Sequence, residues 1–507
     1  MSSRVGVHRA APYRKTFASR FGLGETVAIV ALLILAMRTT LGWLCRISMP
    51  TTWDYGPAQL AIAVDMFVRG APLYPDFRVA PFIPLPYAPV VPSLTAELAP
   101  MFGAGPMAAL EAGRLLTMVS TIIACALIFV LARRIGASVG AALLAALGFM
   151  LSPIVLRWGF EYRVDMPVLA CTLGGIVAFT GGATTTAIAL FVVSFFIKQG
   201  HAVGIATVML FCWTSGQRRR AITFAAIWLT AVAAGTALLA TAYPHYLLNS
   251  FGAVRTPRLD YPAPVLFSSI LIGGNLGVTI LASIALTRRR ATDRLMLCLL
   301  IVASLHSLAS CLRWGSNAYY FLPTLAALAI IAGPAIEMVL ERMRALRSIP
   351  QLAAGAALAS LLCLGFMLAP GAIKASLREV TSLSIHCEVA SANRWDPRAL
   401  DLLHSIEGPI LTDAPDLNLV DSQPNLQWIE LMVLTSMQEV ETFDDAALLD
   451  AIRRHQIAAF ALDADGLERN YRGRPFFWPR LRRAIEANYA AVPAVGPPYL
   501  LLPKKSR

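Results

Sequence analysis

Four groups of polar residues interrupt the long apolar segments of this chain, where ionisable side chains are costly unless they have a partner or a function. The first group is Asp54, which lies between two aromatic residues just after an apolar segment. A partly desolvated carboxylate at such a place can act as a general base. The alternative is that Asp54 caps a helix that begins near Pro57.

The second group is a short connection between two apolar segments, and it carries Arg157, Glu161, Arg163 and Asp165. Four charges in so short a turn exceed what solubility requires, which favours a role in binding. The alternative is a set of mutual ion pairs that only hold the turn.

The third group, Lys198, Gln199, Gly200 and His201, breaks an otherwise continuous apolar stretch. A lysine ammonium in such a break can bind a phosphate that arrives from the lipid phase. His201 can instead be a hydrogen-bonded histidine that only packs.

The fourth group, residues 313–320, combines a planar cation at Arg313, an amide at Asn317 and aromatic faces at Tyr319 and Tyr320. These groups suit a sugar or a diphosphate. The alternative is an aromatic belt at the membrane surface with an anchoring arginine.

The elements that must position these groups are apolar segments, which cross a hydrocarbon core of ~30 Å as helices of about 20 residues. Hydropathy predicts about eleven such spans. They lie at 24–44, 106–131, 138–156, 166–182, 184–197, 202–214, 221–243, 264–286, 294–312, 319–339 and 351–370. The two short spans within 184–214 are either separate helices or one broken pair.

Clusters of basic residues predict the orientation of these spans. With the basic tail 1–23 in the cytoplasm, the arginines of 133–134, 218–220, 288–290 and 342–347 all fall in cytoplasmic loops. The four polar groups then face the periplasm or the exterior. The net charge of +13 is explained by loops that face anionic lipid, so no nucleic-acid partner is expected.

The composition, 57% hydrophobic and 14% charged, is typical of a polytopic membrane protein. We predict an all-α membrane module over 24–370 with a large exterior loop at 46–105. That loop begins with an amphipathic stretch at 58–67, expected to lie on the membrane surface with Gln59 toward water. Prolines then favour an extended path.

The tail 371–507 is predicted to be a small extracytoplasmic α/β domain. Short strand patterns at 409–412, 457–462 and 499–502 are separated by helical patterns. The eight cysteines are scattered without metal-ligand spacing, and only Cys387 is expected in the tail domain. We therefore predict no disulfide within that domain and assign no chemistry to cysteine.

The order and shared sidedness of these motifs resemble the GT-C superfamily of integral-membrane glycosyltransferases. They are most similar to the bacterial branch related to glycosyltransferase family 39, which includes the mannosyl- and aminoarabinose-transferases. The resemblance spans nearly the whole chain. It rests on Asp54, 70–77, the Pro-Tyr-x-Pro element at 86–89, Tyr162-Arg163-Val164-Asp165, Lys198-Gln199, 315–321 and the tail segment 411–416.

The resemblance implies that a sugar is transferred, with inversion, from a polyprenyl-phosphate donor to an acceptor at the outer face of the bacterial inner membrane. It also implies that Asp54 is the general base or orients the acceptor. A phosphate leaving group needs cations rather than a proton donor, so we predict that Lys198, Arg163 and Arg313 bind it. Asp165 is predicted to position an arginine or the acceptor.

Further residues of the same groups are predicted to contact the substrates. They are Tyr55, Glu161, Tyr87, His201, Asn317 and Tyr320. Many members of the superfamily have a second acidic residue directly after the first-loop aspartate, where this chain has Tyr55. A divalent cation therefore stays open as a cofactor, and Glu97, or Asp165 with His201, would be speculative ligands.

Two other functions stay open beside the glycosyltransferase. A transporter or flippase for a lipid-linked substrate also has broken helices and intramembrane charges. The long first loop, the large tail and the absence of inverted-repeat hydropathy argue against it. The third possibility is an inactive membrane scaffold of the same fold. The sequence does not specify the sugar, or whether the acceptor is a glycan, a lipid or a protein.

Overall fold

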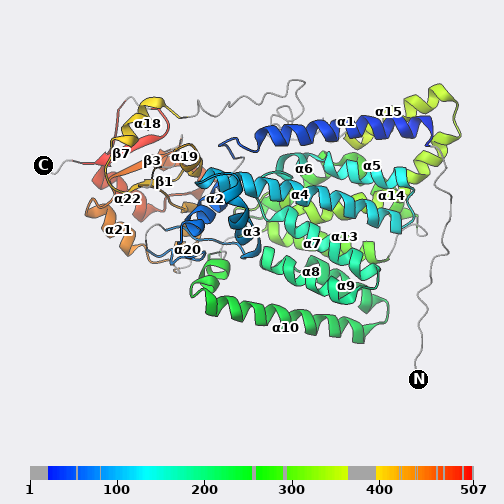
Figure 1. The fold of residues 1–507 in the computed structure, drawn as a ribbon, viewed down its shortest axis with the longest axis horizontal. Helices are drawn as coiled ribbons and strands as arrows, with labels where there is room; N and C mark the ends of the chain where they lie inside the picture. The colour runs from blue at the N-terminus through cyan, green and yellow to red at the C-terminus, as the bar shows by residue number, and fades with distance from the viewer. Residues whose placement is uncertain are drawn as a thin grey trace.

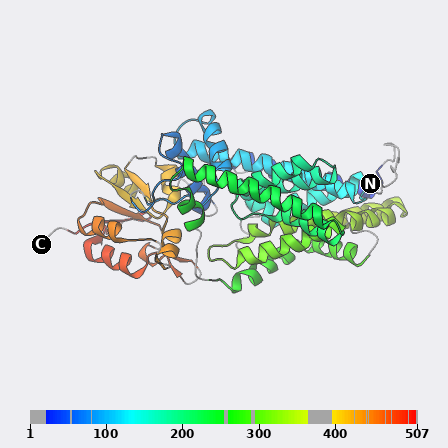
Figure 2. The same cartoon turned by 90° about the horizontal axis from the view of Figure 1, so that it is seen from below.

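The computed structural model describes residues 21–363 and 395–504. It leaves short gaps at 53–54, 80–81, 254–258, 289–293, 422, 424, 440, 442, 464–465, 472–473 and 494–495. An elongated bundle of helices forms one part of the molecule, and a smaller domain with a sheet lies at one end of it (Figure 1). The first exterior loop, in blue, lies between the two parts (Figure 2).

Five helices in the described part of the chain are long and apolar enough to cross a membrane, and one bent pair can add a sixth. The five are α1 (Leu23–Arg46), α4 (Pro106–Arg134), α10 (Arg218–Ala242), α13 (Arg294–Cys311) and the continuous run of η3 (Ala318–Phe321) with α14 (Leu322–Arg344). Shorter apolar helices complete the bundle: α5 (Val139–Met150), α7 (Asp165–Thr180), α8 (Thr184–Ile197), α9 (Val203–Thr214) and α15 (Ser348–Cys363). The predicted helical membrane fold is confirmed, whereas the number of crossings stays a prediction.

Two of the predicted spans are not single helices. The span predicted at 138–156 divides into α5 and α6 (Pro153–Trp158), because the hydroxyl of Ser152 accepts the Val155 N–H and starts a new helix. The other divides into α11 (Pro262–Gly274) and α12 (Leu276–Thr287), which are bent by 87°. The short spans at 184–214 are the separate helices α8 and α9.

The first exterior loop contains α2 (Tyr55–Val68), α3 (Val90–Leu98) and the short η1 (Ala99–Met101). Its amphipathic stretch does not lie on the membrane surface as expected, because α2 packs against α4 and a helix of the tail domain. Gln59 is only 1% exposed, and its amide donates to the carbonyl of Pro84 at 3.0 Å. The side chain that the sequence predicted to face water is therefore buried against another part of the same loop.

The tail domain is built on a five-stranded sheet with the order β2-β1-β3-β7-β6. These strands are β1 (Ile410–Thr412), β2 (Leu426–Trp428), β3 (Ala459–Leu462), β6 (Tyr489–Ala491) and β7 (Tyr499–Pro503). β1 pairs in parallel with β2 and β3, and β7 pairs antiparallel with β3 and β6. Residues 470–471 (β4) and 474–475 (β5) form a separate two-stranded sheet. The predicted strands are present as β1, β3 and β7, whereas β2, β4, β5 and β6 were not predicted.

Helices cover both faces of this sheet. They are α18 (Pro397–His404), α19 (Pro415–Val420), α20 (Leu431–Glu439), α21 (Ala446–Arg453) and α22 (Pro479–Asn488). Side chains alternate along β1, so Ile410 joins the core with α18 and α19 while Leu411 joins the core with α20, α21 and α22. Burial on both faces explains why the central strands are almost entirely apolar.

Cys45, near the end of α1, is disulfide-bonded. The expectation that the cysteines carry no chemistry is therefore wrong. Cys387, the cysteine expected in the tail, lies outside the described residues.

The helices α1 and α15 lie side by side although they are far apart in the chain (Figure 1). Glycine makes this approach possible, because a Cβ on Gly24 would lie 2.2 Å from the carbonyl oxygen of Gln351. A Cβ on Gly355 would lie equally close, 2.2 Å, to the carbonyl oxygen of Gly24. Small residues at such contacts are typical of packing between membrane helices.

Candidate active site

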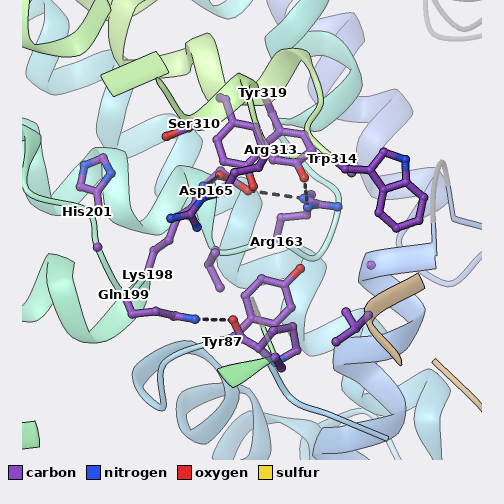
Figure 3. A pocket seen from close by; sticks show the side chains of 18 of the residues that line it. Tyr87, Arg163, Asp165, Lys198, Gln199, His201, Ser310, Arg313, Trp314 and Tyr319 are labelled. Atoms are coloured by element: carbon purple, nitrogen blue, oxygen red, sulfur yellow. Dashed lines mark hydrogen bonds and ion pairs between the residues drawn. The ribbon is translucent and has the colours of Figure 1, made fainter. Parts of the chain in front are cut away.

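A cavity of about 380 Å³ lies where the helical bundle, the first exterior loop and the tail domain meet (Figure 3). Residues from all three parts line it. They include Tyr55, Pro86 and Tyr87 of the first loop, Arg163, Asp165, Lys198, Gln199, His201, His306, Ser310, Arg313, Trp314, Tyr319 and Tyr320 of the bundle, and Met432, Val433 and Ser436 of the tail.

A chain of three charges crosses one wall of the cavity. Asp165 is the first residue of α7, and Lys198 directly follows α8, so both occupy the same end of neighbouring helices. Lys198 Nζ lies 2.6 Å from Asp165 Oδ1, and Arg163 Nε lies 3.4 Å from Asp165 Oδ2. One buried carboxylate therefore fixes the positions of two cations.

Aromatic rings hold the same two cations from the side. The Arg163 guanidinium lies 3.9 Å from the ring centroid of Tyr319 and donates to its hydroxyl. Lys198 Nζ lies 4.2 Å from the ring centroid of Tyr320. Such cation–π contacts stabilise a charge without neutralising it.

The cavity carries more positive than negative charge. Its described lining residues include the cations Arg163, Lys198 and Arg313 and the single carboxylate of Asp165. Arg163 is only 6% exposed and is held by Asp165 and Tyr319, whereas Arg313 is exposed at the rim. An excess of cations in a concave site attracts an anionic ligand.

Two histidine rings meet at 5.1 Å in another part of the wall, His201 and His306. Nε2 of His201 lies 3.1 Å from the Thr172 hydroxyl, which itself lies 2.8 Å from the carbonyl of Val168. This contact fixes the orientation of the His201 ring at the wall of the cavity.

Eight of the residues predicted from the sequence line this one cavity. They are Asp165, Lys198, Arg163, Arg313, Tyr55, Tyr87, His201 and Tyr320. Asp54 lies outside the described residues, and Tyr55, which follows it in the chain, lines the cavity.

Glu161 and Asn317 do not line the cavity. Glu161 is buried, and its Oε2 lies 3.6 Å from the Nη2 of Arg114. Asn317 caps η3, where its Oδ1 accepts the N–H of Ala318 at 2.7 Å. Both side chains have a structural role here: Glu161 pairs with an arginine of α4, outside its own turn, and Asn317 caps a helix.

Several lining residues were missed. His306 lies within an apolar span, and an isolated histidine at membrane depth was the signal that could have identified it. Gln199 belongs to the third polar group but was given no role; it donates to the carbonyls of Pro86 and Ser250, which ties the Lys198 connection to the first loop. Met432, on α20, carries no sequence signal because an apolar helix residue is usually core.

Gly315 allows the tail to approach the cavity rim. Its backbone has a φ of +83°, and a Cβ there would lie 2.9 Å from Cε of Met432. Other residue types are strained in this conformation, and their Cβ would also displace the end of the Met432 side chain.

The described residues contain no group of three or more His, Cys, Asp or Glu side chains that could hold a metal ion. Of the speculative ligands, Asp165 and His201 line the cavity, while Glu97 is exposed on α3. No step of the chemistry below is assigned to a metal.

Glu430 at the start of α20 makes the tail sensitive to pH. Its buried carboxylate accepts the Val433 N–H, and burial raises its pKa to about 8. A raised pKa in the folded state means that the stabilisation is complete below the unfolded value and is lost as pH rises through about 8.

We expect the melting temperature of the full-length protein to decrease as the pH is raised from about 5 to about 9. Glu430→Gln should make this decrease smaller by several degrees. Glutamine keeps an acceptor for the Val433 N–H but cannot ionise. Burial also raises the pKa of Asp413, so part of the fall should persist. Thermal unfolding in detergent measures this, and identical pH profiles for the two proteins would contradict it.

Scans against protein-family models and curated proteins find no match to this chain. Two crystal structures of ArnT from Cupriavidus metallidurans, one in the apo state and one bound to undecaprenyl phosphate, each match with a TM-score of 0.61. Each match covers 94% of this chain and 97% of that chain, at 16% identity. An oligosaccharyltransferase from Archaeoglobus fulgidus in the apo form has a TM-score of 0.48 at 11% identity, over 86% of this chain and 70% of that one. The chain therefore has the same fold as these ArnT structures.

Proposed function

We propose that this protein is an inverting glycosyltransferase of the bacterial inner membrane. It moves a sugar from a polyprenyl-phosphate donor to an acceptor at the outer face. The observation that carries the proposal is the cation-rich, aromatic cavity between the membrane helices and the tail. It is supported by the fold, since a similarly folded ArnT structure is bound to undecaprenyl phosphate.

The donor phosphate binds at Lys198 and Arg313, with Arg163 close behind them. Asp165 and Tyr319 already hold the Arg163 guanidinium, so it contributes positive charge from a fixed position and does not move to the phosphate. The bond from the sugar to the phosphate breaks with its electron pair on the phosphate oxygen, so negative charge on the lipid phosphate grows during the reaction. Fixed cations therefore stabilise the transition state more strongly than they stabilise the bound donor.

Asp54 takes the proton from the acceptor hydroxyl as the acceptor oxygen attacks the anomeric carbon from the opposite side. One displacement of this kind requires one base. Tyr55, one peptide bond away from Asp54, lines the cavity. Asp165 serves in positioning the two cations, since both of its oxygens face them.

The size and walls of the cavity suit a single sugar with its phosphate. Its volume of about 380 Å³ lies toward the lower end of small-molecule pockets, which span about 300–1,000 Å³. Tyr87, Tyr320 and Trp314 offer apolar faces for a sugar ring, and His201 offers an imidazole for hydrogen bonding. The acceptor approaches from the side of the first loop and the tail.

The site opens outside the cytoplasm. Arginine clusters mark the opposite ends of the spans as cytoplasmic. The disulfide at Cys45 adds support, because disulfides persist in oxidising compartments such as the periplasm. The N-terminus is accordingly cytoplasmic, and the tail domain is periplasmic.

A donor assay tests the proposal. Purified full-length protein in detergent, with a native lipid extract as the source of acceptors, is given undecaprenyl phosphate carrying radiolabelled hexoses, pentoses or amino sugars. We expect release of undecaprenyl phosphate and transfer of label with one class of donor. If no donor is consumed while reconstituted vesicles move labelled lipid across the bilayer, the protein is a transporter instead.

A further inference from the structure

One buried arginine binds the backbone of residues 46–51, the segment that leads from α1 into the first exterior loop. Arg114 of α4 is 1% exposed, and its Nη1 donates to the carbonyls of Arg46 at 3.0 Å, Ile47 at 3.0 Å and Met49 at 2.6 Å. Its Nη2 donates to the carbonyl of Thr51. A guanidinium that binds four carbonyls of one segment fixes the path of that segment.

The charge of Arg114 is balanced within the same buried region. Glu161 Oε2 lies 3.6 Å from Arg114 Nη2, and both side chains are 2% exposed. Burying an arginine without such a partner would be strongly unfavourable. The membrane module therefore holds the loop firmly as far as Thr51.

The tail domain holds the next residues. The Thr52 hydroxyl donates to Oδ1 of Asp416 at 2.7 Å. Asp416 is 7% exposed in the first turn of α19, which packs against α2. Further along, the Tyr55 hydroxyl donates to the sulfur of Met432 at 3.4 Å.

We propose that the tail domain positions the reactive carboxylate of the first exterior loop, and that Asp416 is the positioning residue, acting through Thr52. The inference rests on the proposed function, in which Asp54 is the base. Asp54 lies between Thr52 and Tyr55 in the sequence, and contacts to the tail hold both of these residues. Asp416 itself touches neither donor nor acceptor.

Loss of this anchor should affect catalysis rather than donor binding. A misplacement of about 1 Å can cost about 10²-fold in rate. The phosphate-binding cations, Lys198 and Arg313, belong to other elements, so their hold on the donor does not depend on Thr52. Thr52→Val removes the hydroxyl while keeping the shape, and we expect it to lower kcat about 10- to 100-fold with an unchanged KM for the donor.

The test uses the full-length enzyme with the radiolabelled undecaprenyl-phosphate sugars and native lipid extract of the donor assay. Thr52→Ser keeps the donor hydroxyl and should restore most of kcat. Thr51→Val is the matched control, because the Thr51 hydroxyl makes no hydrogen bond within the described part of the chain and its carbonyl contact to Arg114 is unaffected. Asp416→Ala should match Thr52→Val, and the double variant should lose no more than either single one.

Other outcomes overturn the inference. Wild-type kcat in Thr52→Val, an equal loss in Thr51→Val, or a rise in KM with constant kcat would each show that the tail does not position the base. If Thr52→Val does not fold, Asp416→Asn, which keeps an acceptor for Thr52, must retain the activity that Asp416→Ala loses. Asp54→Asn in the same panel separates the two proposals. Full activity in Asp54→Asn would overturn the role of Asp54. If Asp54→Asn is inactive but Thr52→Val is fully active, only the role of the tail is overturned.

Discussion

Asp54→Asn is expected to lower kcat for sugar transfer by about 10²- to 10⁴-fold, the range that a positioned general base contributes. Asparagine keeps the size and hydrogen-bonding reach of the side chain but cannot take the acceptor proton. Donor affinity should stay within about twofold, because the cations that bind the phosphate are unchanged. Single-turnover transfer and donor binding, measured separately, check both expectations.

The matched control for this variant is Asp76→Asn. Asp76 lies in the same exterior loop, and its carboxylate pairs with the side chain of Arg78 at 2.8 Å. This pair is partly exposed, so its loss should cost little activity. If Asp54→Asn retains sugar transfer, Asp54 is not the general base. If Asp54→Asn and Asp76→Asn lose transfer activity equally, the substitutions have damaged the loop in general.

Lys198→Met is expected to raise the KM for the donor about 10- to 100-fold. A hydrogen bond to a charged group contributes about 1.5–3 kcal/mol. Methionine keeps the unbranched stem of the side chain, one atom shorter, and removes the ammonium that lies over Tyr320 and is proposed to face the phosphate. Asp165 would lose its closer partner and keep Arg163, so the excess of positive charge in the cavity falls by one.

Donor binding by scintillation proximity with labelled undecaprenyl phosphate measures this effect without turnover. Lys504→Met serves as the control, because Lys504 Nζ donates to the carbonyl of Glu486 in the tail, away from the cavity. Lys198→Arg should preserve part of the affinity, since it keeps the charge but not the shape. Unchanged affinity in Lys198→Met would place the phosphate elsewhere.

The charged part of the candidate site could be predicted because charge is costly beside apolar spans. Arg163, Asp165 and Lys198 occupy short breaks between helices, and α7 and α8 run in opposite directions, so these breaks meet at one end of the bundle. The separation of Glu161 from Asp165 could not be predicted. The two acids share one turn, and only the position of Arg114 on α4 directs Glu161 away from the cavity.

The contribution of the tail could not be predicted either, because it depends on how two separate parts of the chain pack. The pattern around Gln59 is compatible with a helix on the membrane surface, and only contacts distant in sequence, with α4, α19 and the carbonyl of Pro84, show that the helix is buried. Similarly, nothing in the apolar segment around Asn275 specifies a bend of 87°. Local patterns predict elements, whereas their partners come from contacts distant in sequence.

The backbone contact of Gly24 with Gly355 affects the order in which the protein can be assembled. During synthesis α1 enters the membrane long before α15, the last of the described membrane helices. Until α15 is made, the surface of α1 around Gly24 is in contact with lipid or with an insertion factor. The bundle then closes only when nearly all of the membrane module has been made. A chain that ends before α15 would be inserted but left open along α1, a defect that a membrane protease can recognise.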